Sequence, residues 1–322
     1  MHPIFSGSLI FYACYRAHSH QSLTPAGIAA ALVTGVVHAI HPFSTLTICL
    51  LFGFYFAGNS ATKHKHAIKE RLTVSSTGSG SSKTRTHVQV FANSICASVL
   101  ILAHYAAVYD DIKAGRPVAF SLTAGRWQDA LMVGVMTQYA AVLSDTLSSE
   151  LGILSTSPPR LIYNPARVVP PGTNGGVTLA GFLAGTAGSI FIALISIFAT
   201  PFAATLDSMF KVHLGVVVVA AGVVGTLLDS LLGATMQASV VDGRAGKIVE
   251  SPGGEKVLVK SPSWQEGGAR RRTHEKKEEA EERGPSRRVL VGRDLLSNNA
   301  VNVVMAAAMA AAGVAWGLWH TV

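Results

Sequence analysis

The charged residues of this chain are distributed very unevenly, and this feature limits its possible folds more than any other. Long apolar stretches contain no Asp, Glu, Lys or Arg, while most of the charge lies within 62–88 and 236–299. A soluble domain spreads its charged residues over the whole surface, and they make up about a quarter of the chain. Here only 14% of residues are charged and 49% are hydrophobic. The pattern predicts an all-α integral membrane protein whose main solvent is lipid.

Apolar segments predict a polytopic bundle of about seven or eight membrane-spanning helices. Most are long enough to cross a hydrocarbon core of about 30 Å at a rise of about 1.5 Å per residue. The expected spans are 25–41, 43–58, 89–109, 128–145, 177–200, 212–235 and 300–319. Segment 4–15 is shorter, and we interpret it as a first span or a helix lying in the membrane. It lacks the basic start and the cleavage site of a secretory signal. We treat 1–322 as a single transmembrane domain.

The basic residues predict which side of the membrane each connection occupies. With eight spans, four connections lie on one side: 16–24, 62–88, 146–176 and 236–299. The Lys and Arg residues outside them are Lys113, Arg116, Arg126 and Lys211. Short cytosolic loops are enriched in Lys and Arg, and 62–88 carries six of them against one Glu. We therefore expect these connections to face the cytosol, in an endomembrane such as the endoplasmic reticulum.

Two of the cytosolic connections are long enough to have structure of their own. Residues 62–88 combine basic residues with a Ser/Gly-rich stretch, which is typical of a flexible loop. Residues 238–297 form a longer cytosolic insert. Within it, short β-like runs around 252–254 predict a hairpin over 247–260. Residues 263–288 mix Arg, Lys and Glu and predict a charged, disordered segment.

Several polar residues occur near the cytosolic ends of the spans, where an ionisable group is costly and needs a reason. Asp145 ends one span, Asp229 lies near the same end of another, and Asn93 and Asn302 lie at that depth in two more. A single Asp near a helix end is usually a packing or interfacial residue. Such residues should then be as frequent on the opposite side, which has few: Asp110, Asp111 and Asp129. We therefore expect one pocket at the cytosolic end.

The residue types gathered there favour a cation and a phosphate. Two carboxylates among hydroxyl and amide oxygens suit a hard cation, and magnesium is the usual choice beside phosphates. The Pro- and Gly-rich turn at 170–176 should open a helix with free backbone N–H groups, which suit phosphate. Arg160, Arg167 and Lys63 would add positive charge. The chain has no G-x-x-x-x-G-K-[ST] sequence, so a P-loop enzyme is excluded. Its cysteines and histidines show no metal-ligand spacing.

Seven short segments spread over nearly the whole chain carry a further signal: Leu-Thr-Pro-Ala-Gly (23–27), Ser-Ala-Thr-Lys (60–63), Gln-Val-Phe-Ala-Asn (89–93), Ser-Asp-Thr-Leu-Ser-Ser-Glu-Leu-Gly (144–152), Val-Pro-Pro-Gly-Thr-Asn-Gly-Gly-Val (169–177), Leu-Asp-Ser-Leu-Leu-Gly-Ala-Thr-Met-Gln (228–237) and Leu-Leu-Ser-Asn-Asn-Ala-Val-Asn (295–302). In this order they resemble the transmembrane protein 19 family, also known as domain of unknown function 92. One plant and cyanobacterial branch of that family is known as phytyl-phosphate kinase, while most members have no assigned activity. The resemblance implies a membrane-embedded phosphotransferase that acts on an isoprenoid monophosphate.

Under this first hypothesis, a nucleoside triphosphate donates the phosphoryl group, and the partners are membrane lipid, the nucleotide and the isoprenoid phosphate. No nucleic acid is expected. Magnesium would be held by Asp145, Glu150 and Asp229. The catalytic residues would be Asp145, Asp229 and Lys63. The substrate and its phosphates would be bound by Arg167, Gly172, Thr173, Asn174, Gly175, Gly176, Asn299, Asn302 and Asn93.

A second hypothesis stays open at this point, a multi-pass transporter or a lipid- or anion-binding protein without catalytic activity. Asp145 and Asp229 would then be proton or ion sites in a water-filled cavity. Inverted repeats would favour this hypothesis, and no convincing pair is evident in the sequence. A transporter also needs access from both faces, whereas the polar residues gather at one.

Overall fold

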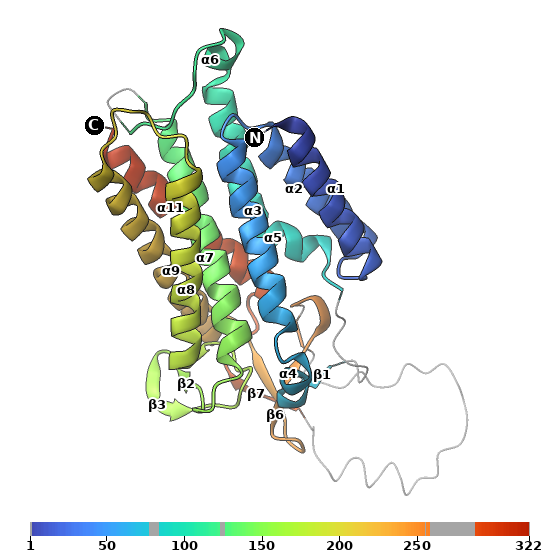
Figure 1. The fold of residues 1–322 in the computed structure, drawn as a ribbon. Helices are drawn as coiled ribbons and strands as arrows, with labels where there is room; N and C mark the ends of the chain where they lie inside the picture. Colours follow the sequence, from blue (N-terminus) through green and yellow to red (C-terminus); the bar gives the residue numbers. More distant parts are fainter. Residues whose placement is uncertain (1, 77–83, 123–125, 255, 258–286, 322) are drawn as a thin grey trace, which may run out of the picture.

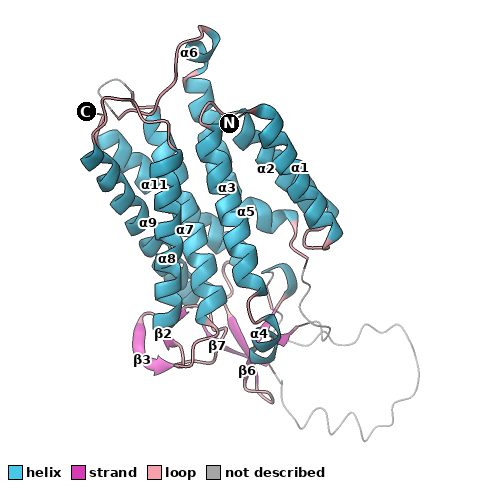
Figure 2. Cartoon of the chain, in the orientation of Figure 1, coloured by secondary structure: helices cyan, strands magenta, loops and turns pink. Residues whose placement is uncertain are grey.

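The chain folds as a helical bundle with two small sheets at one end (Figures 1 and 2). The computed structural model describes residues 2–76, 84–122, 126–254, 256–257 and 287–321. The long helices are α1 (Pro3–Ser19), α2 (Pro25–Ile40), α3 (Ser44–Lys63), α5 (His87–Ala107), α7 (Asp129–Gly152), α8 (Leu179–Ala199), α9 (Ser208–Met236) and α11 (Asn298–Trp319). Their directions alternate, so both termini lie opposite the sheets (Figure 1). We call the end that carries the sheets the sheet end.

Within the described ranges, six helices are long and apolar enough to cross a membrane: α3, α5, α7, α8, α9 and α11. Helix α2 is a shorter apolar helix, and α1 packs beside it. Large apolar side chains such as Phe11 of α1 and Phe198 of α8 are exposed, as a lipid-facing surface requires. These observations confirm a polytopic membrane protein.

Helix α7 lies at the centre of the bundle. Nearly all of its residues between Asp129 and Ser144 are buried, and it packs against α3, α5, α8, α9 and α11. Small residues allow the close approach, because helices in lipid associate by direct packing. A Cβ added to Gly185 of α8 would lie 2.9 Å from the carbonyl oxygen of Ser144. The central position explains why the polar end of α7 is surrounded by the ends of its neighbours.

Four helices begin at the sheet end with side-chain caps, which fix where they start. The hydroxyl oxygens of Thr24, Thr178 and Ser297 accept from the amide three residues later at 3.1, 3.1 and 3.3 Å. Thr86 and Gln89 form a capping box at the start of α5. Such caps satisfy amides that the first turn of a helix leaves unpaired. These caps therefore define the starts of α2, α5, α8 and α11.

Two small sheets at the sheet end correct the expectation of an all-α fold. The four-stranded sheet has the order β1-β6-β5-β7 and contains β1 (Val74–Ser75), β6 (Lys247–Glu250), β5 (Ser239–Asp242) and β7 (Arg287–Val291). Its pairs are antiparallel except β1 with β6. The three-stranded sheet is antiparallel and contains β3 (Asn164–Val168), β2 (Arg160–Leu161) and β4 (Gly176–Val177).

The first strand of the expected hairpin, Lys247–Glu250, pairs with β5, which precedes it in the chain. The second half of that hairpin lies largely outside the described residues. Asp242 starts the turn between β5 and β6 because its carboxylate accepts from two backbone amides at 2.8 and 3.2 Å, and Gly246 closes it with a positive φ of 64°. Of the expected disordered segment 263–288, only residues 287 and 288 are described, and both belong to β7.

The connection at 62–88 also has more structure than expected. It begins with the short helix α4 (His66–Leu72) and continues into β1. Lys247 Nζ donates to the carbonyl of Arg71 at 2.6 Å, and Arg287 Nη2 donates to that of Ser76 at 3.1 Å. This part is therefore joined to the four-stranded sheet. Residues 77–83 lie outside the described ranges.

Candidate functional site

A polar cavity of about 620 Å³ opens at the sheet end, between the ends of α7, α9 and α11 and the Gly-rich turn before β4. We call it the polar cavity. It brings together most of the residues that the sequence singled out: Asn93, Asp145, Glu150, Gly172, Thr173, Asn174, Gly175, Gly176, Asp229, Asn299 and Asn302. Lys63 and Arg167 do not line it.

Asp145 of α7 and Asp229 of α9 meet in this cavity. Their carboxyl groups contact each other, and Asp145 also contacts the hydroxyl of Thr226. Asn302, with its amide orientation assigned from its neighbours, donates to Asp229 Oδ1 at 3.3 Å. Two carboxylates in contact repel each other unless a proton or a cation lies between them. The pair therefore requires either a shared proton or a bound cation.

The oxygen donors around the aspartate pair fit magnesium. Among the described residues, no group of three or more His, Cys, Asp and Glu side chains is placed to hold a metal. Magnesium, however, is usually bound by one or two carboxylates and takes its other ligands from water and substrate phosphates. Asp145 and Asp229, beside Thr226 and Asn302, meet that requirement with two carboxylates in place of the expected three.

Glu150, the third expected ligand, lines the same cavity but has partners of its own. Its Oε2 accepts from Lys69 Nζ at 2.6 Å, and its Oε1 accepts from the Thr62 hydroxyl at 2.9 Å. Lys69 also donates to the carbonyl of Ala61 at 2.7 Å, at the end of α3. The Glu150 carboxylate therefore joins α7 to α3 and α4, and the structure does not bring it to the aspartate pair.

None of the three cations expected at the phosphates, Arg160, Arg167 and Lys63, lines the polar cavity. Arg160 donates instead to the carbonyl of Pro165 at 2.7 Å. A second cavity of about 660 Å³ adjoins the polar cavity and shares Glu150 and Asn174 with it. We call this second cavity the outer cavity. Lys63, exposed at the end of α3, lines the outer cavity and not the polar cavity. Arg167 is exposed on β3 and donates to the carbonyl of Leu290 at 3.1 Å. Arg167 therefore supports contact between the two sheets.

The Gly-rich turn lines the cavity, but most of its amides already have protein partners. Helix α8 begins only at Leu179, after its own cap Thr178, so the turn does not open the helix. The amides of Thr173, Asn174 and Gly176 donate to protein oxygens at 3.2, 2.9 and 2.9 Å. The turn therefore offers fewer free donors to a phosphate than its sequence suggests.

Gly175 explains why this turn needs glycine. Its φ is 72°, a conformation that favours glycine. A Cβ added there would overlap the backbone of α9 at Ser230 and the side chain of Ala234. The turn is therefore pressed against the helix that carries Asp229, and it forms a fixed wall of the cavity.

The three asparagines play different roles. Asn302 contacts Asp229, as described above. Asn299 is buried and donates to the carbonyl of Gly253 at 2.9 Å, which holds the 252–254 turn over the start of α11. Asn93 donates to the carbonyl of Gln89, one turn earlier in α5, at 3.2 Å. Asn302 is thus the asparagine that bears directly on the aspartate pair.

Arg85 is a site residue that the sequence did not single out. It lines both the polar cavity and the outer cavity, and its Nη2 donates to the Thr62 hydroxyl at 2.9 Å. Burial lowers the pKa of the Arg85 guanidinium and nearby Glu150 raises it, but an arginine stays charged in either case. Its backbone bonds with Ser22 and Thr24, at 2.9 and 3.0 Å, fix its position. The position of Arg85 in the site follows from these bonds to the α1–α2 connection, which the sequence does not show.

Gln237, a polar neighbour of Asp229 in the sequence, is a further residue of the site. It follows α9, is buried, and lines both the polar cavity and the outer cavity. Its Nε2 has no hydrogen-bond partner in the described part of the chain. A buried donor is normally paired, so this amide is available to a polar ligand in the cavity.

A second buried polar network lies at the opposite end of the bundle. His104 Nε2 lies 2.8 Å from Asp129 Oδ1, and His104 Nδ1 lies 2.9 Å from His41 Nε2. Arg126 Nε donates to Asp129 Oδ2 at 3.0 Å. The network joins the α2–α3 connection to α5 and α7. The sequence pointed to Asp129 as a rare polar residue on this side but gave no sign of its partners.

The helices, the one-ended polar cavity and its aspartate pair define a polytopic α-helical membrane protein with a candidate ligand site at one membrane face. Comparison with known proteins then gives the family. The family model described as integral membrane protein DUF92 matches residues 8–310, so the chain belongs to this family.

Three of the relatives come from a plant and an archaeon. Protein PGR of Arabidopsis thaliana is 29% identical over 316 residues, which cover 94% of this chain and 91% of that protein. Protein VTE6, chloroplastic, of the same plant is 26% identical over 216 residues, 67% of this chain and 56% of that protein. Uncharacterized membrane protein MJ0933 of Methanocaldococcus jannaschii is 39% identical over 121 residues, 38% of this chain and 47% of that protein. No solved structure matches the chain.

Proposed function

We propose that the polar cavity transfers a phosphoryl group from a nucleoside triphosphate to an isoprenoid monophosphate. The observation that carries the proposal is the contact between Asp145 and Asp229 in a cavity that also contains Arg85. Paired carboxylates suit a magnesium–phosphate complex, and the guanidinium suits a second phosphate. The phytyl-phosphate kinase branch of the same family supports an isoprenoid phosphate as the acceptor. We place the sheet end at the cytosolic face, where the nucleotide is available.

The reaction needs positioning and charge neutralisation more than covalent chemistry. An oxygen of the acceptor phosphate forms a bond to the γ-phosphorus, and the bond between the γ-phosphorus and the bridging oxygen breaks. The nucleoside diphosphate leaves with the electron pair, and the product is the isoprenoid diphosphate. Asp145 and Asp229 would hold magnesium, which neutralises phosphate charge when bound. Arg85 orients the acceptor phosphate, and Asn302 fixes the Asp229 carboxylate.

One observation favours the alternative, a transporter or a lipid- or anion-binding protein. The network of His41, His104 and Asp129 buries ionisable groups at the opposite end as well, and such groups can relay protons in transporters. The kinase proposal accounts better for the asymmetry of the cavities, because the paired aspartates and the neighbouring arginine lie together at one end.

The test uses the full chain purified in detergent with labelled ATP, CTP or GTP, magnesium, and prenyl monophosphates of increasing length. We expect diphosphate product from the wild type. Asp145→Asn and Asp229→Asn should each reduce turnover by at least about 100-fold, because they remove charge aimed at the transferring group. Asp110→Asn, which removes a carboxylate from an exposed site on α6 (Tyr109–Lys113), is the matched control and should keep full activity.

A second readout is independent of turnover. Magnesium should raise the thermal unfolding temperature of the wild type and of Asp110→Asn, but not that of Asp145→Asn, because a ligand stabilises only the state that binds it. No diphosphate from the wild type with any of the three nucleotides would contradict the proposed activity. Full activity of Asp145→Asn would remove the aspartate pair from the mechanism.

A further inference from the structure

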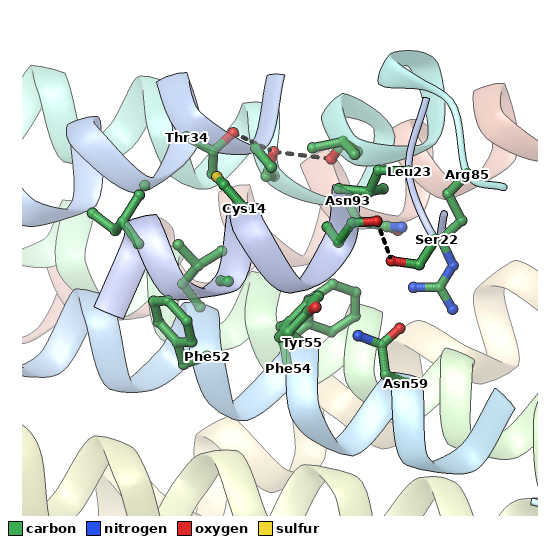
Figure 3. A pocket seen from close by; sticks show the side chains of 18 of the residues that line it. Cys14, Ser22, Leu23, Thr34, Phe52, Phe54, Tyr55, Asn59, Arg85 and Asn93 are labelled. Atoms are coloured by element: carbon green, nitrogen blue, oxygen red, sulfur yellow. Dashed lines mark hydrogen bonds between the residues drawn. The ribbon is translucent and has the colours of Figure 1, made fainter. Parts of the chain in front are cut away.

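An apolar pocket lies between α1, α2, α3 and α5, close to the polar cavity (Figure 3). Its walls include Ile10 and Cys14 of α1, Gly35 of α2 and Phe52 of α3. In Figure 3, Phe52 lies toward one end of the pocket, and Arg85, Asn93 and Asn59 lie at the other. The pocket therefore has an apolar interior and a polar mouth.

The mouth of this pocket is also a wall of the polar cavity. Phe54, Arg85, Gln89 and Asn93 line both. A molecule with a polar head and an apolar chain can therefore occupy both spaces at once. The two spaces meet at Arg85, whose backbone is held by the α1–α2 connection through the bonds to Ser22 and Thr24.

We propose that this pocket binds the first part of the hydrocarbon chain of the isoprenoid monophosphate, with the phosphate at Arg85. The identity of the head group rests on the function proposed above. Within the described ranges, no carboxylate forms an ion pair with Arg85, and its guanidinium donates to a neutral hydroxyl of Thr62. The Glu150 carboxylate lies near enough to raise the pKa of Arg85 but is itself paired with Lys69. The Arg85 guanidinium can therefore bind an anion, and its planar set of donors suits a phosphate.

The size of the pocket sets how much of the chain it holds. Its volume is about 120 Å³, and a water-sized group needs about 10–15 Å³ in this measure. The pocket therefore accommodates on the order of ten heavy atoms, about two isoprene units. Carbons beyond these extend past the pocket into lipid. The pocket should thus select for an apolar chain next to the phosphate but tolerate different total lengths.

The first test measures binding as a function of chain length, with prenyl monophosphates of five, ten, fifteen and twenty carbons and the full chain in detergent. We expect the affinity to rise by about 100-fold from five to ten carbons, since each buried methylene is stabilising. Beyond ten carbons, it should rise by less than about 10-fold. A steady rise of equal size over all four lengths, or no dependence on length, would overturn the proposal.

A matched pair of variants tests where the hydrocarbon chain of the ligand binds. Gly35 and Ile10 both line the pocket, and a Cβ at Gly35 would lie 3.1 Å from Ile10, so Gly35→Leu adds side-chain atoms in the space between α1 and α2. Gly7→Leu introduces the same side chain on α1 at an exposed position with no atom within 4 Å. We expect Gly35→Leu to weaken binding of the ten-carbon phosphate by at least about 30-fold and Gly7→Leu to leave it unchanged. Equal affinities of the two variants would overturn the assignment.

The unaltered chain provides a test that does not depend on the folding of a variant. Cys14 lines the pocket, whereas Cys96 of α5 lies in a different groove. The twenty-carbon phosphate should slow alkylation of Cys14 by a small apolar reagent at least about fivefold and leave Cys96 unaffected. Equal alkylation of Cys14 with and without the lipid would overturn the proposal.

The outcomes separate this inference from the proposed activity. Diphosphate synthesis without protection of Cys14 would support the proposed kinase activity and contradict binding of the hydrocarbon chain in the apolar pocket. Protection of Cys14 and loss of binding in Gly35→Leu, without any diphosphate product, would leave the chain pocket intact and remove the kinase.

Discussion

At the scale of single residues, Glu150 shows how a charged side chain near a site can serve the fold. Its carboxylate and the Lys69 ammonium group lie 2.6 Å apart, with 26% and 11% of their side-chain surfaces exposed. A largely buried ion pair costs desolvation when it forms, but removing one partner leaves an uncompensated buried charge. The pair fixes α4 and the end of α3 beside the polar cavity.

Replacing Lys69 should therefore destabilise the protein more than replacing both members of the pair. We expect Lys69→Met to cost about 1–3 kcal/mol, less than for a fully buried pair because Glu150 is partly exposed. The double variant Lys69→Met/Glu150→Gln should recover about half of that loss. Thermal unfolding in detergent measures both effects. Lys113→Met, at an exposed position on α6, serves as control. Additive losses in the double variant would show that the pair is not coupled.

The aspartate pair could be predicted from the sequence because each member breaks an apolar span near the same end. Asn302 was found by the same argument. Arg85 and Lys69 could not be predicted, since both lie in the basic connection 62–88, where a charged residue gives no local signal. Their positions depend on contacts with residues far away in the chain, such as Ser22 and Glu150. In the sequence Glu150 lies close to Asp145, yet its carboxylate pairs with Lys69 of α4.

At the scale of elements, glycines decide how closely the helices pack around α7. A Cβ added to Gly222 of α9 would overlap Ser189 of α8 and lie 3.1 Å from the carbonyl oxygen of Ala140 on α7. Three helices therefore meet at this one residue. Because Asp145 and Asp229 lie farther along α7 and α9, the spacing of these two helices also sets the distance between the carboxylates.

Gly222→Ala should thus destabilise the bundle by about 1–3 kcal/mol, the range for overpacking a close interface. Gly7→Ala, the same change where a Cβ meets no atom within 4 Å, should be neutral or slightly stabilising because Ala favours the helix. Thermal unfolding distinguishes the two. The variant Ser189→Gly/Gly222→Ala should recover stability, since it removes the side chain that the new methyl group meets. A loss in Gly7→Ala equal to that in Gly222→Ala would refute the packing argument.

The helices were predictable from the sequence, but of the strands only β6 fell within a segment that the sequence predicted to be β. The apolar spans matched the helices because a lipid environment demands long apolar segments, and the expected start at 25 coincides with the Thr24 cap. The strands are two to five residues long, too short for an alternating pattern. Two of their pairings join distant segments, β1 with β6 and β5 with β7. The local sequence around a strand does not indicate which distant segment it pairs with.

At the scale of the whole molecule, the two ends of the bundle differ in what they carry. Both sheets lie at one end of the bundle (Figure 1). The polar cavity and the aspartate pair lie at the same end. The Lys and Arg residues follow the same division: in sequence, all but four of them belong to the connections at the sheet end or to the last turns of the helices that lead into them. The four exceptions are Lys113, Arg116, Arg126 and Lys211. Positive charge close to spans marks the cytosolic side. The sheet end should therefore face the cytosol.

Cysteine labelling in sealed vesicles tests this orientation. Arg244→Cys lies in the exposed turn between β5 and β6 at the sheet end, and Lys113→Cys lies in the exposed helix α6 at the other end. A membrane-impermeant maleimide added from the cytosolic side should label Arg244→Cys at once and Lys113→Cys only after permeabilisation. The unaltered chain gives the background from Cys14, Cys49 and Cys96, which are half-buried within helices. The reverse labelling pattern would place the polar cavity away from cytosolic nucleotide, and a nucleotide-dependent kinase would then lack its donor.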